Sequence, residues 1–204
     1  MKIVVFGASG GTGKQVVQQA LEQGYAVTAF VRSLRKLDLE HQGLSIIQGD
    51  ARDEAAVAQA IAGQDAVISC LGRRRFGRTM ELSEMAACII AGMKRHGVLR
   101  IGYVASAGIH KEIPGLPGLL ARIVLCHVLA DHRCAVDALA ASGLNWTVAR
   151  PVQLVGGRLK GDYKEARQGV PTGESRISRA DVAHFLLRTL TDSTYSRQSV
   201  GLTY

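Results

Sequence analysis

The sequence has no C-x-x-C pair and few cysteines. A disulfide framework or a zinc site usually needs such paired spacing, so both are disfavoured. Two of the cysteines fall in helical patterns among apolar neighbours. We therefore predict four buried thiols in a reducing compartment, at Cys70, Cys88, Cys126 and Cys134.

Long apolar runs are also missing. The longest late stretch, 119–129, is interrupted by Arg122 and His127 and is too short to span a bilayer. The first apolar run stops at Gly7, which is not the pattern of a signal peptide. We therefore expect a cytoplasmic protein that has no membrane partner.

Basic residues are in excess, with a net charge of +8, but they are scattered and no predicted helix carries a basic face. This distribution argues against nucleic-acid binding and favours small anionic ligands. A length of 204 residues suits one domain with a full core. We expect a single domain over residues 1–204, most simply a monomer.

The first stretch, KIVVFGASGGTG, carries the strongest signal in the chain. A buried strand over 3–6 is followed by Gly7, Gly10 and Gly13, and then by an amphipathic helical pattern. Gly7 suits the tight turn, Gly10 lets a pyrophosphate approach, and Gly13 lets the helix pack on the strand. Free backbone N–H groups at 11–13 would face phosphates. The stretch predicts dinucleotide binding; the alternative is a glycine-rich turn that binds nothing.

Strands and helices alternate along the rest of the chain. This order predicts an α/β fold of the Rossmann type, a doubly wound parallel sheet with helices on both faces. Further strands are expected at 26–31, 44–48, 66–70, 101–105 and 146–149, with an edge strand at 200–203. Helices are expected at 53–62, 80–96, 122–142 and, after a Ser178–Asp181 capping box, through 190. The polar segment 156–175 is expected to be irregular.

In open α/β sheets, ligands bind at the carboxyl ends of the strands. The loops 73–78, 108–118 (a possible lid) and 151–175 should lie there and build the substrate site. The expected cofactor contacts are Gly7, Ser9, Gly10, Gly11, Thr12, Gly13, Arg32, Ser33, Arg35, Asp50, Leu71, Gly72, Ser106, Pro151, Val152 and Gln153.

Position 32 follows the second strand and selects the nucleotide. An acidic residue there would bind the ribose 2′-hydroxyl of NAD, whereas this chain has Arg32, with Ser33 and Arg35 nearby. A guanidinium matches a 2′-phosphate in charge and geometry, so we expect NADP(H). The alternative is a solvated surface arginine.

The acid–base pair Tyr-x-x-x-Lys of short-chain dehydrogenases is absent, because none of the tyrosines has a lysine four residues later. Ser106, after the fifth strand, is the catalytic candidate that remains. His110, Lys111, His132 and Gln153 are candidate substrate contacts. A basic loop could attract an anionic acceptor or could simply be solvated; its residues are Arg73, Arg74, Arg75 and Arg78.

The chain resembles the atypical short-chain dehydrogenase/reductases of the biliverdin-IXβ reductase (flavin reductase) type, in the NmrA-like group. The resemblance rests on FGASGGTG, GQDAVI into LG, MKRHGV, SGL and ISRADVAHF, and spans nearly the whole chain. It implies NADPH-dependent hydride transfer to a flavin or a linear tetrapyrrole, with Ser106 at the family's serine. A family histidine after the sixth strand is replaced here by Gln153. That difference favours the flavin over the tetrapyrrole.

Two functions fit these patterns. The first is an NADPH-dependent reductase of FMN, FAD or a related planar anionic acceptor, with no metal. The second is a non-catalytic NADP(H)-binding redox sensor that acts through a protein partner. A nucleotide-sugar epimerase or dehydratase is disfavoured, because it would need the Tyr–Lys pair and a larger C-terminal lobe.

Overall fold

The first strand of the chain lies inside the main sheet, with other strands on both sides. A computed structural model describes residues 1–34, 39–72, 80–110 and 126–204. In these residues the main sheet has the order β3-β2-β1-β4-β5-β6-β10-β8. All its neighbours pair in parallel except β8, which runs antiparallel to β10. Its strands are β1 (Lys2–Phe6), β2 (Ala26–Val31), β3 (Leu44–Gln48), β4 (Ala66–Ser69), β5 (Arg100–Val104), β6 (Asn145–Pro151), β8 (Lys164–Ala166) and β10 (Gln198–Thr203).

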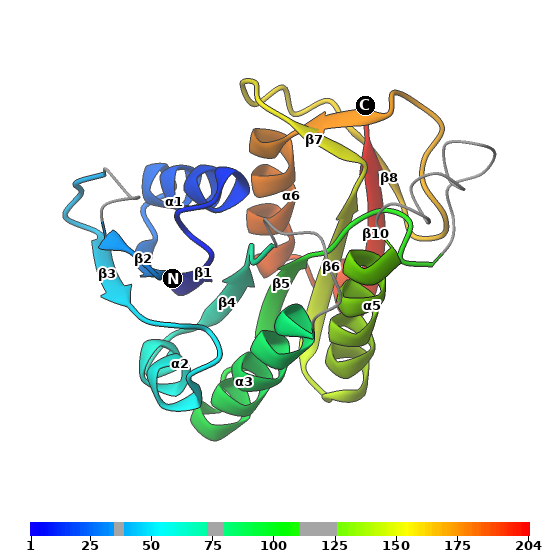
Figure 1. Ribbon diagram of the computed structural model, residues 1–204. Helices are drawn as coiled ribbons and strands as arrows, with labels where there is room; N and C mark the ends of the chain where they lie inside the picture. Colours follow the sequence, from blue (N-terminus) through cyan, green and yellow to red (C-terminus); the bar gives the residue numbers. More distant parts are fainter. Residues whose placement is uncertain (35–38, 73–79, 111–125) are drawn as a thin grey trace.

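Helices cover both faces of this sheet, and two separate cores result (Figure 1). One face is packed by α1 (Gly11–Glu22) and α6 (Arg179–Thr191), the other by α2 (Glu54–Ile61), α3 (Glu81–His96) and α5 (Cys126–Ala141). The strand order reverses between β1 and β4, which is the switch point where ligands bind in such sheets. The predicted Rossmann-type fold is confirmed.

The C-terminal third differs from the sequence prediction. Residues 200–203 belong to β10, which lies inside the sheet between β6 and β8 and not at its edge. The segment expected to be irregular contributes the short β8. A second, two-stranded sheet forms from β7 (Gln153–Val155) and β9 (Arg176–Ser178). A strand of three residues is too short to show an alternating pattern of apolar and polar residues. Whether such a segment forms a strand therefore depends on the strand with which it pairs.

The prediction of four buried thiols is wrong. Cys126 and Cys134 are exposed, and Cys70 and Cys88 are partly buried, all as free thiols. The two exposed cysteines lie eight residues apart on α5 and so share its solvent face. Burial raises the pKa of Cys70 to about 12. Among the described residues, no helix is long and apolar enough to cross a bilayer.

Some predicted site residues lie outside the described residues. They are Arg35, Arg73, Arg74, Arg75, Arg78 and Lys111, together with most of the loop 108–118.

Candidate dinucleotide site

Two of the three motif glycines are required by the fold itself. Gly7 has φ +75°, and a Cβ there would come within 2.7 Å of the Cys70 carbonyl oxygen. At Gly13, a Cβ would lie 2.2 Å from the Gly7 carbonyl oxygen, inside the body of the turn. Only glycine therefore lets β1, β4 and α1 meet this closely.

Gly10 is different. It is the N-cap of α1 with φ −77° and ψ 165°, an extended conformation that any residue adopts, so the backbone does not require glycine at this position. A Cβ there would meet a single near neighbour, the Gly7 carbonyl oxygen at 3.2 Å. The fold thus leaves the space next to Gly10 open on its outer side, as a bound pyrophosphate requires.

The N-terminus of α1 has no side-chain cap. Lys14 N–H donates to the Gly10 carbonyl oxygen at 2.9 Å, so the N–H groups of Gly11, Thr12 and Gly13 lie ahead of this first helical bond. They carry the positive end of the helix dipole and suit a phosphate.

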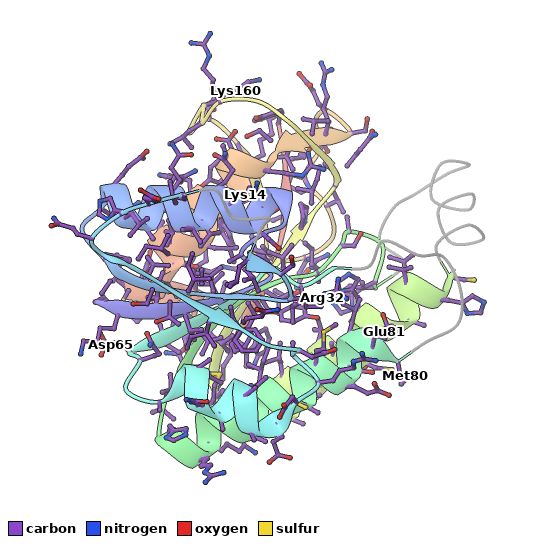
Figure 2. All side chains as sticks on the ribbon, turned by 60° about the vertical axis from the view of Figure 1, so that its left-hand side comes forward. Lys14, Arg32, Asp65, Met80, Glu81 and Lys160 are labelled. Carbon is purple, nitrogen blue, oxygen red and sulfur yellow. The ribbon has the colours of Figure 1, made fainter. Side chains whose placement is uncertain are left out.

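Charged side chains gather where β2 and β3 end. Arg32 follows β2 with an exposed side chain (Figure 2), and its carbonyl accepts a hydrogen bond from the Gln48 amide at 3.3 Å. Asp50 forms an ion pair with Arg52 at 2.9 Å. Hydrogen bonds from Arg52, helped by the charges of Arg52 and Arg32, lower the pKa of Asp50. Sequence reasoning missed Arg52. Its positive charge neutralises the Asp50 carboxylate, which would otherwise oppose the binding of an anion near Arg32.

Arg32→Ala is expected to weaken NADPH binding roughly ten- to a hundredfold and to leave NADH binding nearly unchanged. Only NADPH carries the 2′-phosphate that a guanidinium would bind. Titration of both nucleotides measures the two dissociation constants. Arg95→Ala, an exposed arginine at the end of α3, controls for net charge. Equal losses for both nucleotides would show that Arg32 has a structural role.

The structure brings Ser106 to the carboxyl end of the sheet beside Pro151. Ala105 N–H donates to the Ala149 carbonyl at 2.8 Å, and Ala107 N–H to the Pro151 carbonyl at 2.9 Å. These bonds hold the segment 105–107 against the end of β6. The Ser106 hydroxyl, which is partly exposed, donates to the Ala107 carbonyl at 3.1 Å. Leu71 and Gly72 follow β4 at the same edge.

Val152 and Gln153 leave β6 toward the second sheet. Val152 N–H donates to the Leu202 carbonyl at 3.2 Å, and Gln153 N–H to the Ser175 carbonyl at 3.2 Å. The Gln153 side chain is exposed. Their contacts with the cofactor remain predictions, as do those of Ser9 and Ser33, which are both partly buried.

The two histidine candidates differ in exposure. His110 is exposed, whereas His132 is 6% exposed and contacts the Tyr103 ring edge-on at 6.3 Å between centroids. Burial lowers the pKa of His132 to about 4, so the ring is neutral at pH 7. Its neighbour Asp131 caps α3, since its carboxylate accepts the backbone N–H groups of Leu82 and Ser83 at 3.0 and 2.9 Å. A substrate contact of either histidine remains a prediction.

Three of the tyrosines are committed to other hydrogen bonds. Tyr163 pairs with His184 at 2.9 Å, the Tyr195 hydroxyl donates to Glu165 at 2.7 Å, and that of Tyr204 donates to Asp181 at 2.5 Å. These contacts lie around α6, β8 and the C-terminus. They give no substitute for the missing tyrosine acid.

The comparison with known families decides the cofactor. A family model described as NAD(P)H-binding matches residues 7–193, nearly the whole chain. The chain belongs to the NAD(P)H-binding family. The predicted use of NADP(H) is thereby confirmed at the level of the family. The binding of its phosphates at the uncapped N-terminus of α1 stays a prediction.

Individual proteins of known sequence or structure are also similar to this chain. The photosystem II assembly factor Ycf39 of Synechocystis is 26% identical over 98% of this chain, which spans 61% of that protein. A short-chain dehydrogenase/reductase from Veillonella parvula, solved with NADP, has a TM-score of 0.87 at 23% identity, covering 100% of this chain and 94% of that one. ChuY, an anaerobillin reductase from Escherichia coli O157:H7, has a TM-score of 0.83 at 23% identity, covering 99% and 96%. At 23% identity the two solved structures show that this chain shares their fold, which agrees with its place in the NAD(P)H-binding family.

Proposed function

We propose that this NAD(P)H-binding protein is an oxidoreductase that transfers hydride from NADPH directly to a planar anionic acceptor, a flavin or a linear tetrapyrrole. The observation that carries the proposal is the composition of the sheet edge. Ser106 lies there beside Pro151, while the Tyr–Lys pair that would protonate a carbonyl oxygen is absent from the sequence. The acceptor must therefore need little acid catalysis when the hydride arrives.

A flavin meets this requirement. NADPH, when bound, supplies the hydride, which adds to a ring nitrogen of the electron-poor flavin, and water supplies the proton that completes the reduced flavin. The residues of the chain bind and orient the two planar groups, which is a large contribution in itself. The Ser106 hydroxyl can turn from the Ala107 carbonyl to hydrogen-bond the acceptor or the nicotinamide amide.

The tetrapyrrole branch is supported by ChuY, which acts on anaerobillin and shares the fold. Against it stands Gln153, where the resembling family has a histidine. We therefore place flavin first and tetrapyrrole second.

A redox sensor is the competing function. The lack of a Tyr–Lys pair fits a protein that binds NADP(H) without turnover, and the Synechocystis relative is an assembly factor. This chain spans less than two thirds of that relative, so the partner surfaces of the longer protein do not transfer.

NADPH oxidation at 340 nm separates the two functions. The purified protein is assayed with FMN, FAD, riboflavin and biliverdin, and NADPH binding is measured in parallel. Turnover of at least one acceptor supports the reductase. Tight NADPH binding without turnover of any acceptor would reject the reductase and support the sensor.

Ser106→Ala is expected to lower turnover only modestly, roughly three- to tenfold, because it removes one orienting hydrogen bond. NADPH affinity should change little. Ser106→Thr, which keeps the hydroxyl, should retain more activity than the alanine variant. A Ser106→Ala protein that binds NADPH normally but is inactive would contradict unassisted hydride transfer.

A further inference from the structure

An arginine from the far end of the chain lies against the glycine turn. Arg179 is the first residue of α6, directly after the N-cap Ser178. The next residue is docked on α1, since the buried Gln19 amide donates to the Ala180 carbonyl at 2.9 Å. The Arg179 side chain lies against Gly11, the N-terminal residue of α1.

The contact with Gly11 is close. A Cβ on Gly11 would lie 2.6 Å from Cδ and 2.7 Å from Nε of Arg179, and 3.6 Å from its Cζ. Among the described residues outside the chain neighbours and helix backbone of Gly11, these three atoms are the nearest to that position, and the backbone of Gly11 is not left-handed. A Cβ at position 11 would therefore meet the flexible Arg179 side chain and displace it from its present place against Gly11.

The positive charge of Arg179 near the N-terminus of α1 is not neutralised by a described carboxylate. Within the described ranges no carboxylate pairs with it, and the first turn of α1 has no acidic residue. Its side chain is partly exposed and borders the N–H groups that precede the first bond of α1. A guanidinium that lies beside a helix N-terminus adds a side-chain cation to a site that already favours anions.

We propose that Arg179 binds the pyrophosphate of the dinucleotide together with the backbone N–H groups of α1, and that the missing side chain of Gly11 leaves the space in which the arginine lies. The proposal concerns a part of the cofactor that NADPH and NADH share. In this it differs from Arg32, whose expected partner is the 2′-phosphate alone.

The first test measures dissociation constants of NADPH, NADH and ADP-ribose. Arg179→Ala is expected to weaken all three by a similar factor, roughly tenfold, and the factor should shrink as salt is raised. Arg179→Lys should recover part of the loss. Arg158→Ala is the matched control, because it removes the same charge from an exposed arginine whose carbonyl lies 3.4 Å from the Ser178 hydroxyl, next to Arg179 in the chain.

The second test places a Cβ in the space in which Arg179 lies. Gly11→Ala should displace Arg179 and weaken binding about as much as Arg179→Ala, and the double variant should be no worse than either single variant. Unfolding curves of all variants check that each is folded.

Unchanged affinities in a folded Arg179→Ala protein would overturn the proposal. So would a loss confined to NADPH, since that would place the arginine at the 2′-phosphate. Fully additive losses in the double variant would contradict the proposed role of Gly11. None of these readouts depends on which acceptor, if any, the protein reduces.

Discussion

Gly10→Val is expected to abolish NADPH binding in a protein that remains folded. The backbone at position 10 is extended, and a Cβ there meets a single near neighbour, at 3.2 Å. The unfolding free energy should therefore stay within about 1 kcal/mol of wild type. The valine methyl groups would instead occupy the space ahead of the α1 N-terminus, where the pyrophosphate is expected. Affinity should fall by roughly a hundredfold or more, the loss of several charge-assisted hydrogen bonds.

Gly13→Ala is the matched control for this variant. Its Cβ would lie 2.2 Å from the Gly7 carbonyl oxygen, so the turn itself must move. We expect destabilisation by more than about 2 kcal/mol, with weaker binding as a consequence of the damaged turn. Urea unfolding and NADPH titration of both variants separate a lost site from a lost fold. A folded Gly10→Val protein with normal NADPH affinity would contradict the placement of the phosphates.

Asp181→Asn is expected to destabilise the protein by about 2–4 kcal/mol at pH 7. The carboxylate is fully buried and accepts four hydrogen bonds. Oδ1 accepts from the backbone N–H groups of Lys160 and Gly161 at 3.0 and 2.8 Å, and Oδ2 from the hydroxyls of Ser178 and Tyr204 at 2.6 and 2.5 Å. It thereby joins the loop before β8, the start of α6 and the last residue of the chain. An amide cannot accept all four bonds.

The effect of Asp181→Asn should depend on pH. Burial by itself would raise the pKa of Asp181, but hydrogen bonds from Ser178, Tyr204 and the two backbone N–H groups outweigh it and lower the pKa. The carboxylate therefore contributes its stability above its ordinary pKa of 3.8 and loses it as the pH falls through the lower value of the folded state. The difference between wild type and variant should be full at pH 7 and should shrink below about pH 4.

Urea unfolding at pH 7 and pH 3 measures this. Asp137→Asn is the control, since Asp137 is 60% exposed and forms an ion pair with Arg133 one turn earlier on its own helix. Asp137→Asn should lower the free energy of unfolding by less than about 0.5 kcal/mol. Two outcomes would contradict this role of the buried carboxylate. One is an equal loss of unfolding free energy in the two variants, and the other is a loss in Asp181→Asn that does not change with pH.

The features that the sequence alone determined are local ones. The bounds of β2 and β3 follow from their apolar runs. The glycine turn follows from backbone positions that exclude a Cβ, and the capping box of α6 from a hydroxyl three residues before the N–H that it accepts. Ser178 and Asp181, and likewise Gly7 and Gly13, are close in the chain, so their spacing carries the information, although the clash that makes Gly7 necessary is with the distant Cys70. The α/β class, and with it the edge of the sheet where a ligand binds, follows from the order of such local signals.

The tertiary structure decided what depends on residues far apart in the chain. The N-cap of α3 comes from Asp131 on α5, because no side chain at the start of α3 caps it. The last strand lies inside the sheet because β8 pairs with its outer edge. Arg179 reaches Gly11 because α6 packs across α1 on one face of the sheet. The spacing of residues along the chain cannot predict such contacts. They form only when separate helices and strands pack on the same face of the sheet and exclude water between them.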